Sequence, residues 1–255
     1  MGRLEGKTAV VTGASSGIGR GTALRFAQEG ATVALMARRH DLLEELTEEI
    51  RAFGGTAIPI PCDITDREQV AAAVGKAAEK LGRIDILVNN AGMADGNAMC
   101  ASMDDTLFDT VVDLNLRGTY LMTKACLARM ETQKKGTIVN ISSIAGAYGY
   151  GGFSYASTKA GIIGMTRNLA IQYAGTEGME IRCNAVCPGP VPTALVSGLH
   201  KPVMDPFLEI IARHQDVKVG LTNIEQQVNV ILFLASDESS GINGQYIVVD
   251  KGRGL

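Results

Sequence analysis

Short apolar runs alternate with longer amphipathic runs along most of this chain. The short runs are rich in β-branched residues and nearly continuous in apolar character, which is typical of buried parallel strands. The alternation therefore predicts a parallel sheet with helices on both faces. The predicted strands are residues 8–12, 32–36, 56–61, 84–89, 136–141, 180–186 and 246–249, and the predicted helices are 17–29, 40–53, 66–81, 102–131, 154–174 and 223–235.

Right-handed crossovers between such strands predict a Rossmann-like, doubly wound α/β fold with the strand order 3-2-1-4-5-6-7. Its ligand crevice is expected at the carboxyl ends of the strands. No linker or repeat interrupts the alternation, so we expect one dinucleotide-binding and catalytic domain over residues 1–255. Capping boxes are predicted at three helix starts: Thr65 with Glu68, Ser102 with Asp105, and Thr222 with Glu225.

Composition narrows the class of protein. The 255 residues are 46% hydrophobic and carry a formal net charge of −3, with Lys and Arg scattered along the chain. No run reaches the ~18 apolar residues of a membrane span, and the first strand begins too early to leave room for a signal peptide. The charge pattern has no nucleic-acid footprint. We therefore expect a soluble, cytoplasmic protein without nucleic-acid or membrane partners.

The five cysteines contain no close Cys-x-x-Cys pair. Cys183 and Cys187 fall in a predicted strand and at its exit. Small buried thiols are the favoured interpretation of both, so we expect no metal site.

Tyr155 and Lys159 lie four positions apart and share one face of the predicted helix 154–174. A phenol with an ordinary pKa near ~10 is only about 0.1% ionised at pH 7, a deficit of roughly 4 kcal/mol. An ammonium about 4–5 Å away contributes on the order of 3–4 kcal/mol at an effective dielectric of about 20. The pair predicts a tyrosine that acts as acid or base at neutral pH, with a nearby serine hydroxyl holding the reacting oxygen.

A glycine-rich loop follows the first predicted strand. Gly13, Gly17 and Gly19 have the spacing Gly-x-x-x-Gly-x-Gly and lead into an amphipathic helix. Glycines there allow a tight turn and a close approach of the backbone to a pyrophosphate, whose charge the helix N-terminus attracts. The loop indicates a nucleotide site.

Further motifs accompany this loop: Asn89-Asn-Ala-Gly92, Asn115, Ser142-Ser143, Tyr155 with Lys159, and Pro188-Gly189. In this combination the chain resembles the short-chain dehydrogenase/reductase family, from about residue 4 to about residue 250. The resemblance implies an NAD(P)(H)-dependent oxidoreductase that interconverts a ketone and a secondary alcohol by hydride transfer.

The resemblance also implies the catalytic roles. Tyr155 would exchange a proton with the substrate oxygen, and Lys159 would lower the pKa of Tyr155 and hold the ribose hydroxyls. Asn115 would shape a helix bend and anchor a proton-relay water. The family serine is the second of its pair, which favours Ser143. The segment before Tyr155 is one residue short, however, and this places Ser142 at the common distance.

Cofactor contacts are implied at the strand ends. Asp63 would accept a hydrogen bond from the adenine amino group, or serve only as a turn residue before the next helix. Val191 and Thr193 would bind the nicotinamide carboxamide, in a loop that its prolines also stiffen. The predicted cofactor-binding residues are Gly13, Ser15, Ser16, Gly17, Ile18, Gly19, Arg38, Arg39, Asp63, Ile64, Asn90, Ala91, Gly92, Tyr155, Lys159, Pro188, Gly189, Val191 and Thr193.

The end of the second strand bears on the choice of dinucleotide. NAD-preferring members carry an acidic residue where this chain has Ala37, followed by Arg38 and Arg39. Without the carboxylate a 2′-phosphate meets no repulsion, and Arg38 can bind it with hydrogen bonds worth about 1.5–3 kcal/mol. The other interpretation is that the arginines only open a solvated helix. A second basic residue, often found before the middle glycine, is replaced by Ser16. We predict a modest preference for NADP(H), with NAD(H) possible.

The substrate side is less defined. Residues from about 194 to 220 fall where the family builds its lid, and their apolar face either lines a hydrophobic cavity or packs the lid on the domain. An apolar carbonyl compound such as a hydroxysteroid or a 3-oxoacyl compound fits the first interpretation. Tyr148 and Tyr150 are expected at the mouth of the site. Two segments depart from the family pattern, Val219–Glu225 and Asp250–Gly252, which puts lid docking and C-terminal subunit contacts in doubt.

Small residues recur on the predicted helix 154–174, at Ala156, Ala160, Gly161 and Gly164. In the family this helix and the preceding one pair across a two-fold axis, so we predict a homotetramer, unless these faces serve only the sheet.

Two other functions stay open. A non-catalytic dinucleotide-sensing module usually loses the tyrosine or lysine, and an isomerase or dehydratase with bound cofactor usually has a longer chain.

Overall fold

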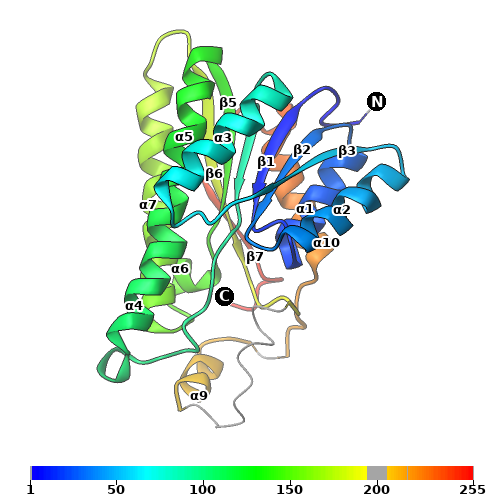
Figure 1. Ribbon diagram of the computed structural model, residues 1–255. Coiled ribbons are helices and arrows are strands. Elements are labelled where there is room, and N and C mark those ends of the chain that lie inside the picture. Colours follow the sequence, from blue (N-terminus) through cyan, green and yellow to red (C-terminus); the bar gives the residue numbers. More distant parts are fainter. Residues whose placement is uncertain (1, 194–205, 217, 255) are drawn as a thin grey trace.

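The computed structural model describes residues 2–193, 206–216 and 218–254. Its sheet has seven parallel strands in the order β3-β2-β1-β4-β5-β6-β7 (Figure 1), so the predicted fold class and strand order are confirmed. The strands are β1 (Thr8–Thr12), β2 (Thr32–Ala37), β3 (Thr56–Pro61), β4 (Ile86–Asn89), β5 (Lys135–Ile141), β6 (Glu180–Pro188) and β7 (Tyr246–Val249).

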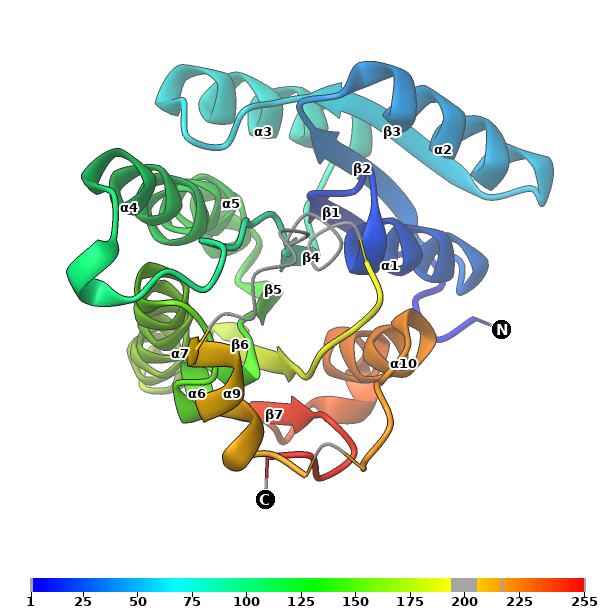
Figure 2. The same cartoon turned by 90° about the horizontal axis from the view of Figure 1, so that it is seen from below.

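Helices cover both faces of the sheet (Figure 2). They are α1 (Gly17–Gln28), α2 (His40–Ala52), α3 (Arg67–Leu81), α4 (Asp105–Val112), α5 (Thr119–Gln133), α6 (Ile144–Tyr148), α7 (Phe153–Ala174), α9 (Pro206–Arg213) and α10 (Ile224–Ala235). In β1, Ala9 and Val11 pack in the core with α1, α2 and α10, while Val10 packs in the core with α3 and α5. Because alternate side chains enter two separate cores, the strand reads as continuously apolar.

The predicted helix 102–131 is wrong in its start and in its continuity. A 3₁₀ turn at Cys100–Ser102 comes first, α4 starts at Asp105, and a π-helical turn at Asp113–Gly118 joins α4 to α5. A π turn inserts one extra residue into a helix and is often found at functional sites. The apolar spacing in the sequence does not reveal this insertion.

The three predicted capping boxes are displaced by one or two residues. The residues that cap α3, α4 and α10 are Asp66, Asp104 and Asn223, and only Asn223 forms a full box, with Gln226. A carboxylate or amide that closely follows each predicted hydroxyl is the acceptor instead. The sequence pattern also predicts neither α6 nor α9, which span only five and eight residues.

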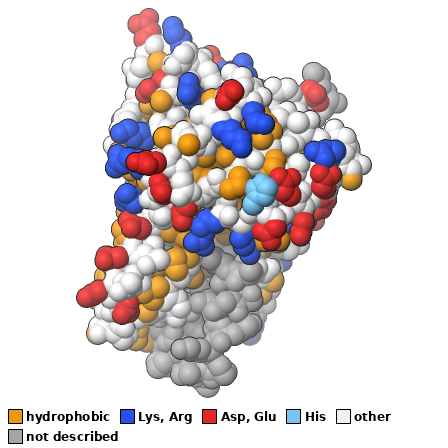
Figure 3. All heavy atoms as spheres, in the orientation of Figure 1, with side chains coloured by type: hydrophobic (Ala, Val, Ile, Leu, Met, Phe, Trp, Pro, Cys, Tyr) orange, Lys and Arg blue, Asp and Glu red, His pale blue; other side chains and the backbone are white. Residues whose placement is uncertain are grey.

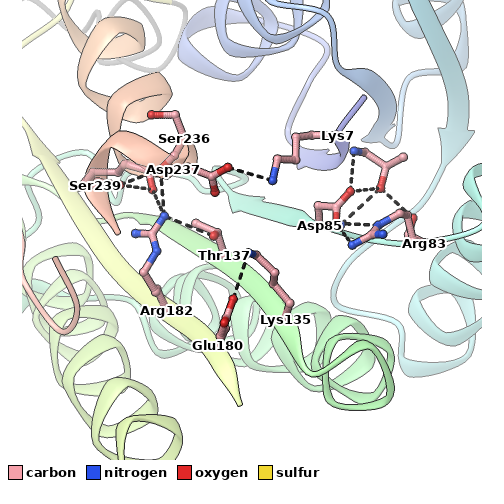
Figure 4. A network of polar contacts seen from close by, with 12 residues as sticks. Lys7, Arg83, Asp85, Lys135, Thr137, Glu180, Arg182, Ser236, Asp237 and Ser239 are labelled. Carbon is pink, nitrogen blue, oxygen red and sulfur yellow. Dashed lines mark hydrogen bonds and ion pairs between the residues drawn. The ribbon is translucent and has the colours of Figure 1, made fainter. Parts of the chain in front are cut away.

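A network of polar contacts joins the amino-terminal ends of the strands (Figure 4). Arg182 of β6 donates to the carbonyls of Leu234 and Ser236, at 3.2 and 3.0 Å. Asp85 pairs with Arg83 and accepts from the backbone amide of Thr8 at 3.0 Å. These contacts fix the strands at the end opposite to the predicted ligand crevice.

The surface in the view of Figure 1 carries both signs of charge. Figure 3 shows Lys and Arg side chains intermingled with Asp and Glu side chains over this face. Within the described part of the chain, no helix combines the length and the apolar character that crossing a membrane would require.

Candidate active site

A cavity of about 570 Å³ lies at the carboxyl ends of the strands, where a doubly wound sheet binds its ligands. Residues that end or directly follow six strands line it: Gly13, Ala37, Cys62, Asn90, Ser142 and Pro188. Of the predicted catalytic and cofactor-binding residues, all but Gly19 and Asn115 line this cavity. Of the two tyrosines expected at its mouth, Tyr150 lines it and Tyr148 does not. The fold thus brings together motifs that are spread over 180 positions of the chain, from Gly13 to Thr193.

The glycine loop after β1 allows the protein backbone to approach a ligand closely. Gly13 and Gly17 have φ values of 65° and 55°, which favour glycine. A Cβ on Gly19 would lie 2.3 Å from Nδ2 of Asn90, so this glycine supports the loop from beneath rather than lining the cavity. The N-cap of α1, Ser16, makes no side-chain capping bond. The first-turn amides are therefore available to an anion, and the loop fits a pyrophosphate.

The adenosine end of the cavity is the end that β2 and β3 form. Ala37 ends β2, and the side chains of Arg38 and Arg39 are exposed beside it. Arg39 Nη2 donates to Ser15 Oγ at 3.0 Å, so Arg39 reaches across to the glycine loop. Asp63 Oδ1 accepts from the amide and hydroxyl of Thr65, at 3.0 and 2.8 Å. Asp63 therefore has its turn role and also lines the cavity.

Lys159 lines the cavity and is buried, with 4% of its surface exposed. Its Nζ donates to the carbonyl of Ile141 at 2.8 Å and lies 5.7 Å from the ring centroid of Tyr155. Burial lowers the pKa of Lys159 to about 8. A lysine with this pKa changes its charge within the range in which enzymes work.

Burial raises the pKa of Tyr155, and a hydrogen bond with Ser143 opposes that rise. From the sequence, the charge of Lys159 is expected to lower this pKa. In this structure the loss of solvent around the phenol outweighs the lowering influences. A raised pKa keeps the phenol protonated, which is the form that donates a proton.

The two serines after β5 have different partners. Ser142 Oγ donates to the carbonyl of Lys159 at 2.7 Å and is buried, so its hydroxyl is occupied by the backbone of α7. Ser143 Oγ accepts from the amide of Ala145 at 3.1 Å, and the interaction of its hydroxyl with the phenol acts to lower the pKa of Tyr155. The geometry therefore favours Ser143 as the partner of Tyr155.

Comparison with known proteins fits this site. A family model described as "Enoyl-(Acyl carrier protein) reductase" matches residues 13–253. The chain is 42% identical over 251 residues to the "3-oxoacyl-[acyl-carrier-protein] reductase FabG" of Thermotoga maritima, with 98% of each chain covered. The chain belongs to the short-chain dehydrogenase/reductase family.

The names of other relatives of this short-chain dehydrogenase/reductase refer to different substrates. It is 34% identical to the "3beta-hydroxysteroid dehydrogenase 2" of Eggerthella lenta, over 98% of this chain and 95% of the relative. The crystal structure of a levodione reductase superposes with a TM-score of 0.89 at 31% identity and covers 98% of each chain. The chain is thus an oxidoreductase of a family that acts on CH–OH and C=O groups with NAD(P).

Asn115 lies outside the cavity lining of this short-chain dehydrogenase/reductase. Its side chain is fully buried in the π turn, where Oδ1 accepts from the amide of Met93 at 2.8 Å and Nδ2 donates to the Met93 carbonyl at 2.9 Å. A Cβ on Gly92 would lie 3.1 Å from Asn115 Oδ1 and 3.3 Å from Lys159 Nζ. Asn115 therefore ties the loop after β4 to the helix layer, and Gly92 keeps space open beside Lys159.

Asp95 is a cavity residue that the motifs do not indicate. It is 4% exposed, and its Oδ2 accepts from the amide of Tyr155 and the hydroxyl of Ser154, each at 2.9 Å. A Cβ on Gly152 would lie 1.9 Å from its Oδ1, so this approach needs glycine. Asp95 thus anchors the first turn of α7, which carries Tyr155. The only signal in the sequence is a polar Asp95-Gly-Asn97 turn beyond a strand end.

The cysteines fit the prediction of buried thiols. Cys183 and Cys187 are buried in β6, and burial raises the pKa of the Cys183 thiol to about 12. Among the residues that the structure describes, no group of three or more His, Cys, Asp or Glu side chains is arranged to hold a metal ion.

Proposed function

We propose that this protein interconverts a ketone and a secondary alcohol, with Tyr155 as general acid/base and a preference for NADP(H). The observation that carries the proposal is the meeting of Ser143, Tyr155 and Lys159 in the cavity that the glycine loop also lines. A hydride carrier and a proton donor are the two parts that this reaction needs.

In the reducing direction the Tyr155 phenol gives its proton to the carbonyl oxygen, and the Ser143 hydroxyl holds that oxygen in place. The dinucleotide, when bound, supplies the hydride that the carbonyl carbon gains. The C=O double bond thus becomes CH–OH with one hydride and one proton added. Lys159 holds the ribose hydroxyls and, when charged, favours the phenolate that remains. Asn115 positions the π turn and the loop beside Lys159.

The preference for NADP(H) rests on the residues after β2. Ala37 offers no carboxylate to repel a 2′-phosphate, and Arg38 and Arg39 both line that end of the cavity. The bond from Arg39 to Ser15 holds one guanidinium over the glycine loop. NAD(H) remains usable in this proposal, because Ser16 stands where a second basic residue would strengthen the preference.

In this proposal a large part of the substrate molecule is apolar. Apolar side chains are among the residues that line the cavity, including Ile144, Pro190 and Ile211. The predicted lid spans about 194–220, and of the apolar lid residues that the sequence suggests, Leu199, Val203 and Met204 lie outside the described residues. The relatives named for 3-oxoacyl and hydroxysteroid substrates support a carbonyl compound with a hydrophobic part.

A cofactor-oxidation assay against a carbonyl panel tests the function. The panel holds acyl-thioester ketones, steroids, sugars and small diketones, with NADPH consumption followed at 340 nm. We expect consumption with at least one ketone and the matching alcohol as product. A dinucleotide-sensing module would give no turnover, and an isomerase would convert its substrate without net change in cofactor.

The activity should depend on the charge of Lys159. Its pKa of about 8 means that the ammonium is present below about pH 8 and is lost as the pH rises through that value. Because the charged form holds the ribose and assists Tyr155, we expect kcat/KM for NADPH to fall above about pH 8. The measurement is kcat/KM for NADPH from pH 6 to 10. In Lys159→Arg, which keeps its charge, the residual activity should lack this fall, and an identical fall there would contradict the assignment.

We propose further that the chain is one cytoplasmic domain over residues 1–255 and that it forms a homotetramer. The support for the tetramer is an exposed stripe along α7 made of Phe153, Ser157, Ala160, Gly164 and Ile171. Ile171 is 75% exposed, and a Cβ on Gly164 would meet nothing within 4 Å. Small residues between two apolar ends suit a close helix contact across a two-fold axis.

Gly164→Arg should break the tetramer into smaller species without unfolding the protomer, because the new side chain enters open space in one chain but collides with its copy. Gly75→Arg on α3 is the matched control, since a Cβ there also meets nothing. Sedimentation velocity should give four times the 26.9 kDa chain mass for the wild type and for Gly75→Arg. A concentration-independent monomer in the wild type, or an intact tetramer in Gly164→Arg, would exclude this interface.

A further inference from the structure

The two segments that depart from the family pattern contact each other. Lys251 Nζ donates to the carbonyl of Leu221 at 2.8 Å, and Arg253 Nη1 donates to the carbonyl of Val219 at 2.8 Å. The amide of Asp216 in turn donates to the carbonyl of Arg253 at 2.9 Å. The C-terminal tail therefore docks on the segment that follows α9.

A buried carboxylate sets the course of this tail. Asp250 is 5% exposed, and its two oxygens accept from the amides of Gly252 and Gly254, at 2.8 and 2.9 Å. Lys251 and Gly252 both have left-handed φ values, 61° and 81°. The chain turns sharply after β7 and returns towards the cavity, where Arg253 is one of the lining residues.

Arg253 lies at the opposite end of the cavity from the predicted 2′-phosphate site. Arg38 and Arg39 follow β2, which is second in the sheet, whereas Arg253 follows β7, the last strand. Between them Gly189 packs directly on Asp250, because its Cβ would lie 2.7 Å from the Asp250 Cβ. Gln215, which accepts from Arg253, follows His214, whose carbonyl accepts from the Tyr150 hydroxyl at 2.9 Å, so Arg253 lies on the side of the cavity that Tyr150 and Tyr155 line.

The guanidinium of Arg253 is held in place by neutral groups. Its Nε donates to Oε1 of Gln215 at 2.9 Å, and its Nη1 is taken by the Val219 carbonyl. No described carboxylate lies within 4.0 Å of it, in contrast to the paired Arg3, Arg20 and Arg83. Of the five guanidinium N–H donors, these two bonds use two. A half-buried cation that is held in place and pairs with no described carboxylate is suited to bind an anion.

We propose that Arg253 binds a carboxylate of the substrate, so that the natural substrate is a ketone or secondary alcohol that also bears a carboxylate. This inference rests on the proposed function. Arg253 is offered as a specificity-determining residue, with Gln215 as the residue that orients it. The apolar wall near Ile211 would cover the carbon chain between the two functional groups, and its low polarity would strengthen the ion pair.

Matched acids and esters test the inference. The probes are 3-oxobutanoate, 4-oxopentanoate and 5-oxohexanoate, each with its methyl ester, and kcat/KM is measured with saturating NADPH. For at least one pair we expect a higher kcat/KM for the acid than for its methyl ester. In Arg253→Gln the ratio of acid to ester should fall by about 10- to 100-fold, which is the effect of losing a charge-assisted hydrogen bond. The change in this ratio, rather than the rate on either probe alone, is the quantity that tests the proposal.

Arg213→Gln is the control, because Arg213 is exposed on α9 and does not line the cavity. It removes the same charge and should leave every ratio unchanged. A Tm measurement checks that Arg253→Gln does not unfold the C-terminal tail. Arg253→Lys keeps the positive charge and should recover part of the acid-to-ester ratio. If no probe of either kind is turned over, the proposed function is contradicted. If esters are turned over and the ratio is the same in wild type and Arg253→Gln, only the carboxylate proposal fails.

Discussion

Tyr155→Phe should lower kcat by about 10²- to 10⁴-fold, which is the usual effect of removing one positioned acid. The substitution deletes one hydroxyl whose partner is Ser143 and leaves the ring that packs near Lys159. NADPH binding, measured by fluorescence titration, should stay close to the wild-type value, because Lys159 and the glycine loop are intact. Lys159→Ala should instead weaken both the binding of NADPH and the rate.

Tyr173→Phe is the matched control for this experiment. Tyr173 is on the same helix, but its hydroxyl donates to Glu131 at 2.5 Å and lies outside the cavity lining. We expect wild-type kcat for this variant. A wild-type rate in Tyr155→Phe, or an equal loss in both variants, would remove Tyr155 from its catalytic role.

Ala37→Asp/Arg38→Ile should lower the ratio of kcat/KM for NADPH over NADH by about 10- to 100-fold. The lost guanidinium bonds to a 2′-phosphate are worth about 1.5–3 kcal/mol, and the new carboxylate adds repulsion of that phosphate while offering an acceptor to ribose hydroxyls. The wild-type ratio should exceed one. Arg39→Ile tests separately whether the arginine that bonds to Ser15 contributes.

Arg51→Ile provides the control for the dinucleotide experiment. Arg51 is an exposed residue at the end of α2 that pairs with Glu48, so its replacement removes one positive charge far from the cavity. The ratio should not change in this variant. A wild-type ratio below one would overturn the preference for NADP(H), and an unchanged ratio in the double variant would show that these positions do not set it.

Much of the fold could be predicted because each strand is a short apolar run between clear breaks. The register of β1 with β2, from Thr8 opposite Thr32 to Thr12 opposite Met36, sets the glycine loop beside the end of β2. Once the sheet order is known, the motifs at the strand ends must converge on one cavity. The predicted helix boundaries were wrong where two nearby residues could both cap the helix, as at α4, which Asp104 caps rather than Ser102.

The contacts that the sequence could not reveal depend on close three-dimensional approach. Asp95 reaches the amide of Tyr155 across 60 positions, and only because Gly152 has no side chain. Arg253 and Val219 are 34 positions apart and share no recognisable spacing. The hydroxyl of Ser142 donates to the carbonyl of Lys159, which favours Ser143 as the catalytic serine, and the sequence gives no sign of this contact. Two adjacent serines look alike in a sequence, but their side chains point to different partners.

Transfer of deuterium tests the central proposal most directly. A ketone that the panel identifies is reduced with NADPH deuterated at C4 of the nicotinamide, prepared in both stereochemical forms, and the product is analysed by mass spectrometry and NMR. We predict one deuterium on the carbinol carbon from one of the two forms, with one oxidised cofactor per alcohol formed. A product without deuterium from either form, or conversion of the substrate with the cofactor left reduced, would contradict hydride transfer between cofactor and carbonyl as the function of this site.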